Sequence, residues 1–289
     1  MITHPDKVMF PDEGITKGDL AAYYTAMAPF LIPHLRRRPI TMERYPSGIG
    51  QKGFIQKDVS KGFPEWLQRI SLPKKGGVVH YPLVTDTRSL LWIVNQNCIT
   101  PHVWTSRAPA VNRPDVCVFD FDPSVDEPKV LRASVLALRD LLEEVGQPAW
   151  VKTSGSKGFH VVVPVHSASF AEVGRFAQAV ATALVDRDPA HLTLAFSKAD
   201  RRGRIYLDVG RNAPGATFAA VYAVRAKPGA PVSAPCTWDE IASGAVGPQT
   251  FTLRTMTKRV QQVGDLWEGL SKRKRSLALV LRRLARLRR

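Results

Sequence analysis

A short apolar segment that ends in two carboxylates constrains the fold of this chain more than any other feature. The segment from Val116 to Pro123 is rich in valine and phenylalanine and predicts a buried strand. Because side chains alternate along a strand, Asp120 and Asp122 share one face, while Phe119 and Phe121 point to the other. Two like charges this close repel each other, and a hard divalent cation such as Mg²⁺ or Mn²⁺ would offset the repulsion. Two interpretations stay open: a metal site, and a strand end whose acids are solvated.

Hydrophobic periodicity and turn residues predict several helices and strands around this segment. The expected helices are 17–35, 86–97, 127–145 and 170–185, and the expected strands are 40–45, 54–57, 78–82, 149–153, 159–165, 204–209 and 217–224. This alternation favours a mixed α+β (or α/β) fold, with a central sheet covered by helices and two packed lobes in one catalytic unit. We expect that unit to span residues 1–270, followed by a basic tail at 271–289.

The charge of the chain favours a polyanionic partner. The formal net charge is +16, and residues 271–289 hold nine lysines or arginines and no acid. Removing them leaves 32 basic against 25 acidic residues, or +7, so the remaining body is basic too. In the tail, Leu277, Val280, Leu281, Leu284 and Leu287 follow helical spacing. A helix packed on the body and a frayed basic tail both remain open.

The sequence offers no membrane or export signal and no disulfide pattern. It contains no apolar run near the roughly 20 residues of a membrane helix, and its first residues lack a signal-peptide core. Cys98, Cys117 and Cys236 are odd in number and widely spaced, which argues against a zinc site or a disulfide framework. We therefore expect a cytoplasmic protein without a membrane partner.

A polar turn follows the acidic strand at Lys152 to Val161. It joins two expected strands and does not precede a helix, so it is not a Walker loop. Its glycines expose backbone N–H groups, Ser154 and Ser156 carry hydroxyl donors, and Lys157 carries positive charge. His160 begins the returning strand. The segment is suited to phosphate capture, and the alternative is a polar hairpin turn.

A third acid lies in a later apolar strand. Asp208 is flanked by Leu207 and Val209, and a buried carboxylate needs a cationic partner. If Asp208 meets Asp120 and Asp122, the three carboxylates can hold two ions about 3.5–4 Å apart, an arrangement suited to in-line phosphoryl or nucleotidyl transfer. A salt bridge with a nearby arginine is the alternative.

Taken in order, these three motifs resemble the archaeo-eukaryotic primase superfamily, and specifically the polymerase domains of bacterial ATP-dependent DNA ligase D. The resemblance covers about residues 3 to 265. The other similar segments are 6–11, 15–20, 44–48, 211–212, 215–217 and 222–233. The chain has no Lys-x-Asp-Gly ligase motif, so a stand-alone polymerase and an excised domain both remain open.

The resemblance implies a primase-polymerase fold and a role for each matching residue. The catalytic metal ligands would be Asp120, Asp122 and Asp208, with Asp208 beside the primer 3′-hydroxyl. The contacts of the incoming nucleotide would be Ser154, Lys157, His160, Arg225 and, near the sugar, His102. The contacts of DNA would be Lys7 and Lys17 at a recessed 5′-phosphate, Arg44, and Phe54 stacked on the template.

The resemblance also implies a function: metal-dependent, template-directed addition of nucleotides, preferably ribonucleotides, to 3′ ends at gaps or double-strand breaks in non-homologous end joining. It implies two Mn²⁺ or Mg²⁺ ions, nucleoside triphosphates, and DNA with a 5′-phosphate. End-joining proteins such as Ku and a DNA ligase would be partners, in the nucleoid. The alternatives are a non-catalytic module that bridges DNA ends, a gap-filling polymerase of excision repair, and a nuclease that uses the same acids.

Overall fold

The chain forms two compact units, each built from separate stretches of sequence. The structure is a computed structural model that describes residues 2–59, 62–166 and 168–287. Unit 1 comprises Met1–Pro109, Thr217–Ala234 and Phe251–Asp265, and unit 2 comprises Ala110–Ala216, Pro235–Thr250 and Leu266–Arg289. Both units mix helices and strands, as the predicted α+β class requires. The expected domain boundary at residue 270 stays a prediction.

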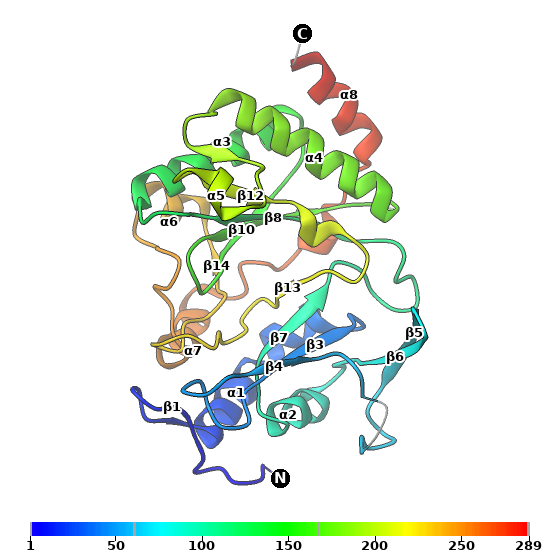
Figure 1. Ribbon diagram of the computed structural model, residues 1–289, viewed down its shortest axis with the longest axis vertical. Helices are drawn as coiled ribbons and strands as arrows, with labels where there is room; N and C mark the ends of the chain where they lie inside the picture. The colour runs from blue at the N-terminus through cyan, green and yellow to red at the C-terminus, as the bar shows by residue number, and fades with distance from the viewer. Residues whose placement is uncertain (1, 60–61, 167, 288–289) are drawn as a thin grey trace. The chain divides into compact units, whose positions relative to one another are not determined.

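Unit 1 is built on a four-stranded sheet with the order β13-β7-β3-β4, and β1 with β2 and β5 with β6 form two smaller antiparallel pairs. Its elements are β1 (Val8–Phe10), β2 (Ile15–Thr16), α1 (Lys17–Leu35), β3 (Ile40–Arg44), β4 (Phe54–Gln56), β5 (Arg69–Lys74), β6 (Gly77–Pro82), α2 (Thr87–Asn95), β7 (Cys98–Trp104), β13 (Thr217–Ala219) and α7 (Leu253–Val263). In Figure 1 these elements occupy the blue to cyan part of the ribbon, together with β13 and α7.

Local sequence signals explain where the helices of unit 1 begin. The Thr16 hydroxyl accepts a hydrogen bond from Asp19 N–H, and the Asp19 carboxylate accepts one from Thr16 N–H, which closes a capping box at α1. Asp86 and Ser89 form the same motif at α2. The buried face of α1 then reaches the sheet, where the Tyr24 hydroxyl donates to Ile99 O over 2.7 Å.

Unit 2 is built on a six-stranded sheet with the order β11-β12-β8-β10-β9-β14. Its elements are β8 (Val116–Asp122), α3 (Pro128–Glu144), β9 (Trp150–Thr153), β10 (Phe159–Pro164), α4 (Phe170–Arg187), β11 (Leu192–Thr193), α5 (Lys198–Arg201), β12 (Ile205–Asp208), η1 (Gly210–Asn212), β14 (Pro235–Cys236), α6 (Trp238–Ser243), η2 (Leu270–Lys272) and α8 (Leu277–Leu287). Strand β8 is antiparallel to both of its neighbours, β10 and β12.

Side chains of β8 point alternately to the two faces of the sheet, so its phenylalanines lie in the core of unit 2 and its aspartates lie on the opposite face. Phe119 and Phe121 are fully buried, and Phe119 meets Phe176 of α4 with ring centroids 6.2 Å apart. Figure 1 shows α3 and α4 on the same side of this sheet. The two aspartates of β8 therefore lie on the sheet face away from these helices, as the sequence predicts.

Most expected elements are confirmed, and one strand is wrong in length. The helices expected at 17–35, 86–97, 127–145 and 170–185 correspond to α1, α2, α3 and α4. The strand expected at 217–224 ends at Ala219, because the chain turns there and Tyr222 adopts a positive φ of 62°. Strands β5 and β7 were not predicted from the sequence, because prolines at 73 and 101 interrupt their apolar pattern.

Most of the described part of the basic tail forms the helix α8, which packs on the rest of unit 2. Leu277, Val280 and Leu284 of α8 are buried, and α8 packs against α4. Leu287 is half exposed and does not join this seam. Residues 288–289 lie outside the described residues. Of the two interpretations of the tail, the packed helix is therefore the one that the structure shows.

No helix in the described ranges is both long enough and apolar enough to cross a membrane. Within the same ranges, Cys98, Cys117 and Cys236 are buried and form no disulfide.

Candidate active site

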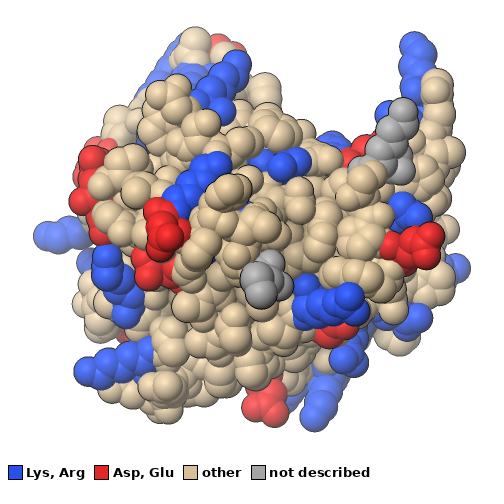
Figure 2. Space-filling model, turned by 90° about the horizontal axis from the view of Figure 1, so that it is seen from below, with Lys and Arg blue, Asp and Glu red and all other residues tan. Residues whose placement is uncertain are grey.

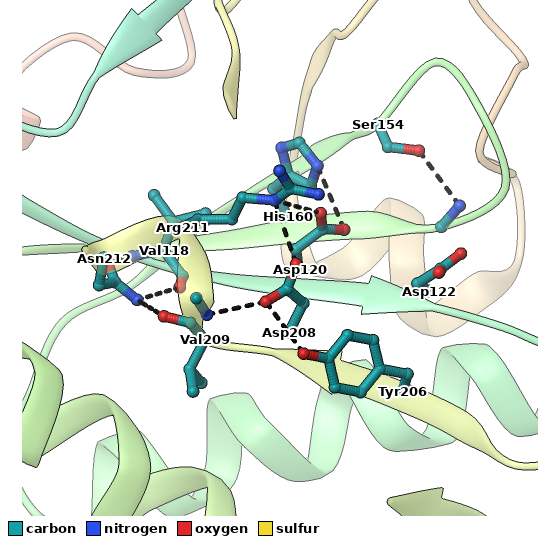
Figure 3. Close-up of polar contacts among 12 residues, drawn as sticks. Val118, Asp120, Asp122, Ser154, His160, Tyr206, Asp208, Val209, Arg211 and Asn212 are labelled. Atoms are coloured by element: carbon teal, nitrogen blue, oxygen red, sulfur yellow. Dashed lines mark hydrogen bonds and ion pairs between the residues drawn. The ribbon is translucent and has the colours of Figure 1, made fainter. Parts of the chain in front are cut away.

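A row of charged residues crosses the centre of the unit 2 sheet. Asp120 of β8 pairs with Asp208 of β12 on one side and with His160 of β10 on the other. Directly opposed residues on neighbouring strands project from the same face, so the three side chains converge. The Nε2 atom of His160 lies 3.4 Å from Asp120 Oδ1. The fold therefore brings two of the three predicted acids and one predicted phosphate ligand together (Figure 3).

Arg211 bridges the two central carboxylates. Its Nε atom lies 3.4 Å from Asp120 Oδ2 and 3.2 Å from Asp208 Oδ2. The side chains of Asp120 and Asp208 are mostly buried, at 16% and 14% exposure, whereas that of Arg211 is 44% exposed. A partly exposed cationic group thus stands between two buried anions.

The third acid has a different partner. Asp122 stands apart from the central pair in Figure 3, and its Oδ2 accepts a 2.8 Å hydrogen bond from Arg201 Nη1. The Arg201 guanidinium lies 4.4 Å from the centre of the Tyr206 ring, and the Tyr206 hydroxyl donates to Asp208 Oδ1 over 3.3 Å. Burial and the neighbouring Asp208 raise the pKa of Tyr206 to about 12, so this hydroxyl keeps its proton.

Asp120 is the most strongly perturbed acid of the site. Burial alone would raise its pKa. The charge and hydrogen bond of His160 outweigh burial, with further contributions from Arg211 and Lys152, and lower that pKa to about 2. Lys152 is fully buried and pairs with His160 in the next strand of the row. Asp120 is therefore anionic at neutral pH.

Two groups fix the backbone around Asp208. The Asn212 side chain accepts from Val118 N–H over 2.8 Å and donates to Val118 O over 2.7 Å, which ties η1 to β8. The N–H of Gly210 donates to Asp208 Oδ1 over 2.7 Å. Gly210 thus orients the Asp208 carboxylate, and Asn212 holds the turn that follows it against β8.

The polar turn between β9 and β10 lies on the same sheet. The Ser154 hydroxyl oxygen accepts hydrogen bonds from the N–H groups of Ser156 and Gly158, each over 3.1 Å. A Cβ atom at Gly158 would lie 1.7 Å from Phe121 O, so only glycine lets the turn approach β8 this closely. Lys157 is exposed at the tip. The turn is compact and keeps a cationic side chain in solvent.

The donor set suits a hard cation. Within the described ranges, no three His, Cys, Asp or Glu side chains are gathered closely enough to hold a metal ion, and Asp122 is paired with Arg201. Two guanidinium groups neutralise the carboxylates: Arg211 pairs with Asp120 and Asp208, and Arg201 pairs with Asp122. Carboxylate oxygens are the ligands that Mg²⁺ and Mn²⁺ prefer, so the residues present fit the predicted ions.

Two predicted nucleotide contacts lie in unit 1 around a glutamate. His102 Nε2 is 3.1 Å from Glu43 Oε2, and the Tyr45 hydroxyl donates to Glu43 Oε1 over 3.0 Å. Burial alone would raise the pKa of Glu43. The hydrogen bond and charge of His102 outweigh it, with smaller contributions from Arg225 and Tyr45, and lower that pKa to about 2. His102 and Arg225 thus share one anionic neighbour.

The distribution of surface charge does not by itself locate a DNA site. Figure 2 shows lysine and arginine side chains spread over one face, with aspartate and glutamate side chains between them. A more specific signal comes from Lys17, which is 2% exposed at the start of α1. Its pKa is lowered by burial and by the charges of Lys7 and Arg44. Three of the predicted DNA contacts therefore form one cationic cluster, and a bound anion would offset the repulsion among them.

The fourth predicted DNA contact lies beside this cluster. Phe54 of β4 is 47% exposed, and its ring lies 5.2 Å from the guanidinium carbon of Arg44. Arg44 also donates to Gln96 O over 2.6 Å and to the Gln56 side chain. An exposed aromatic ring next to a held arginine is suited to stacking on a base.

The residues that surround the acids were not predicted from the sequence. Arg201, Arg211 and Asn212 were not among the predicted site residues, although they stand within seven residues of Asp208. Arg211 and Asn212 form one of the segments that resemble the family, and all three residues flank a strand that carries a buried carboxylate, which requires a cation. Glu43 gave no such signal, because its partner His102 lies 59 residues away.

Comparison with known proteins now identifies the family. Residues 16–267 match the model of the LigD primase-polymerase domain. This chain belongs to the LigD primase-polymerase domain family. A solved structure of the "Polymerase Domain from Mycobacterium tuberculosis Ligase D in complex with DNA" superposes with a TM-score of 0.89 at 30% identity, covering 95% of this chain and 99% of that one.

Curated members of the LigD family are longer than this chain. The multifunctional non-homologous end joining protein LigD of Mycolicibacterium smegmatis is 32% identical over 275 residues, which are 92% of this chain and 35% of that protein. The LigD protein of Pseudomonas aeruginosa is 32% identical over 289 residues, which are 98% of this chain and 34% of that protein. The chain thus spans about a third of the length of these relatives.

These findings confirm the resemblance, the α+β primase-polymerase fold and, at the level of the family, a nucleotidyltransferase of the end-joining primase-polymerase kind. The roles assigned to individual residues stay predictions.

Proposed function

We propose that this chain extends the 3′ end of a DNA primer by template-directed nucleotidyl transfer, with Asp120, Asp122 and Asp208 as ligands of two Mn²⁺ or Mg²⁺ ions. The observation that carries the proposal is the pair of buried carboxylates, Asp120 and Asp208, directly opposed on neighbouring strands and bridged by Arg211. Two carboxylates this close repel each other, so the site favours a cation between them.

The metal ions, when bound, supply the positive charge that stabilises the attacking and leaving oxygens of an in-line displacement. The chain's own residues prepare the site. The primer 3′-oxygen attacks the α-phosphorus of the nucleoside triphosphate and pyrophosphate leaves, while Asp208, oriented by Gly210 N–H, accepts the proton of the 3′-hydroxyl. Ser154, Lys157 and His160 hold the triphosphate from the turn beside the acids.

Unit 1 provides the remaining contacts of this proposal. His102 lies near the sugar of the incoming nucleotide, and Arg225 contacts its phosphates. Glu43 lies 3.1 Å from His102 and orients it, and the charge of Arg225 contributes to the low pKa of the same glutamate. The chain prefers ribonucleotides in this proposal, because the family resemblance implies that preference.

The proposed DNA substrate is a gap or a broken end with a recessed 5′-phosphate. Lys7, Lys17 and Arg44 bind that phosphate, because an anion offsets the mutual repulsion of the three cations. Phe54 stacks on the template. The polymerase domain of M. tuberculosis ligase D was solved with DNA, which supports a DNA substrate here. Ku and a DNA ligase are the proposed partners, in the cytoplasm at the nucleoid.

The test is extension of a primer across a gapped duplex by Asp120→Asn and Asp208→Asn variants. We expect each to lose at least about 100-fold in rate, since bound metal supplies several kcal/mol of charge stabilisation and 1.36 kcal/mol is tenfold. Asp126→Asn is the matched control, because Asp126 is exposed in the same unit. Full extension by the Asp120→Asn variant would refute the assignment.

The same substrate separates the other candidate functions. A gel shift without incorporation by the parent protein indicates a module that only bridges ends. Shortened products indicate a nuclease. Equal extension with and without a 5′-phosphate at the gap argues against a role at recessed ends and favours general gap filling.

A further inference from the structure

A second recognition surface lies in unit 2 at the opposite end of β9 from the Ser154 turn. A cavity of about 670 Å³ opens where β9 begins, lined by the end of α3, the start of α6 and the segment that leads into the tail. This volume lies within the ~300–1,000 Å³ typical of ligand pockets. None of the predicted site residues lines it.

Two tryptophans form the aromatic part of the cavity. Trp150 and Trp238 are both half-buried. The indole N–H of Trp238 donates to Ala149 O over 3.2 Å, which fixes the ring in the wall. The guanidinium of Arg139 lies 5.8 Å from the centre of this ring and is held by Asp140 over 2.7 Å. An oriented indole with an arginine over it is an arrangement on which a flat base can stack.

Three exposed cations form the rim. Lys272, Arg273 and Arg275 line the cavity, and within the described residues none of them forms an ion pair. Together with Arg139 they outnumber the two acids of the lining, Glu143 and Glu268. The cavity therefore has an excess of positive charge in solvent.

The rim is held in place by the fold. The indole N–H of Trp267 donates to Val151 O over 3.4 Å, and Leu270 is buried. At the other end of the basic run, Arg275 O accepts a 3.1 Å hydrogen bond from His166 N–H, and Leu277 of α8 is buried. Binding at this rim therefore requires little further ordering of the backbone, which favours affinity.

We propose that this cavity, with Trp150 and Trp238 in its wall and Lys272, Arg273 and Arg275 at its rim, binds a single strand of nucleic acid apart from the active site. The indoles stack on bases, and the rim cations contact phosphates. A duplex does not meet this requirement, because its bases are already stacked on each other. An acidic peptide would match the cations but would offer no flat ring to stack on the indoles.

The test measures the affinity of a fluorescein-labelled oligothymidine of about ten nucleotides, with a 5′-hydroxyl, by anisotropy between about 50 and 200 mM salt. We expect Trp238→Ala to raise the Kd about fivefold or more, and Trp238→Phe to retain most of the affinity because it keeps a ring. We expect the double variant Arg273→Ala/Arg275→Ala to lower the slope of log K against log salt by about 1.4, since each phosphate contact on a single strand contributes about 0.7.

The matched control removes the same charge from the same tail outside the cavity. Arg282→Ala/Arg286→Ala on α8 should leave affinity and slope close to those of the parent. An equal loss in this control would overturn the proposal, because it would show a general effect of charge. Unchanged binding in Arg273→Ala/Arg275→Ala would overturn it too, and these exposed positions do not endanger folding.

Two further measurements distinguish a nucleic-acid site in this cavity from the active site and from a site for acidic peptides. Extension across a single-nucleotide gap should be unchanged in Arg273→Ala/Arg275→Ala, because the active site is intact. A poly-glutamate peptide should displace the oligonucleotide poorly. Displacement at equal concentration with the same dependence on Trp238 would identify an acidic-peptide site and refute the assignment to nucleic acid.

Discussion

Replacing Asp120 by asparagine should remove a specific, pH-dependent part of the stability of this protein. In the folded state the pKa of Asp120 is about 2 instead of 3.8, because the charges of His160, Arg211 and Lys152 outweigh the effect of burial. A carboxyl whose pKa is lower in the folded state stabilises that state above pH 3.8. The stabilisation disappears as the pH falls through 2.

The size of this contribution follows from the two pKa values. At 1.36 kcal/mol per pKa unit, a lowering from 3.8 to about 2 corresponds to about 2 kcal/mol at pH 6. Roughly half of it remains at pH 3, since the folded state is still largely ionised there while the unfolded state is mostly protonated. The free energy lost in Asp120→Asn should therefore be about 1 kcal/mol larger at pH 6 than at pH 3.

The assay is urea denaturation of the parent and of Asp120→Asn at both pH values, with chelator present so that no metal contributes. Asp126→Asn controls for the general loss of one negative charge from a chain of net charge +16. His160→Gln should reduce the pH dependence as well, because it removes the strongest partner of Asp120. A free-energy difference between the parent and Asp120→Asn that is the same at pH 3 and pH 6 would refute the reasoning.

Further predictions concern the turn, the tail and the phosphate cluster. Gly158→Ala should lower the melting temperature and the rate of primer extension, because its Cβ atom would clash with Phe121 O. The control is Gly174→Ala in α4, where the space is open: this variant should be neutral or more stable by up to ~1 kcal/mol in urea titrations. Leu284→Ala should destabilise the protein by about 2–5 kcal/mol in urea denaturation, because the Leu284 side chain is only 2% exposed. Leu279 is 48% exposed, so Leu279→Ala should destabilise the protein by less than about 0.5 kcal/mol. Lys17→Met should weaken gel-shift binding of a gap with a 5′-phosphate and leave a 5′-hydroxyl gap unaffected; equal loss on both would contradict the phosphate role.

Local pattern was sufficient wherever the interaction partners are near in sequence. The alternation of β8 predicted that Asp120 and Asp122 share a face opposite the phenylalanines, and the structure confirms it. The start of α1 was predictable from Thr16, since the capping partner lies three residues away. The packed face of α8 followed from the spacing of Leu277, Val280 and Leu284, whereas Leu281 is only partly buried and Leu287 is exposed.

Chain-distant contacts were beyond local pattern. The sequence could state that Asp208 needs a cationic partner but not which one, and both an arginine and a metal stayed open. The fold answers with Arg211, because η1 is tied to β8 by Asn212 across 94 residues. The same is true of Glu43 and His102, which are 59 residues apart and meet only through the pairing of β3 with β7.

By itself the sequence determined the chemical groups of this protein: three acids in apolar strands, a polar glycine turn suited to phosphate, and a basic surplus concentrated in the tail. Only the tertiary structure decided which charges neutralise one another. It places Asp208 opposite Asp120 on neighbouring strands and pairs Asp122 with Arg201 in a salt bridge. It also holds the basic run of the tail beside two tryptophans. The physical reason is that alternation and capping act over a few residues, whereas the electrostatics of a buried site depend on strands that pair across long stretches of chain.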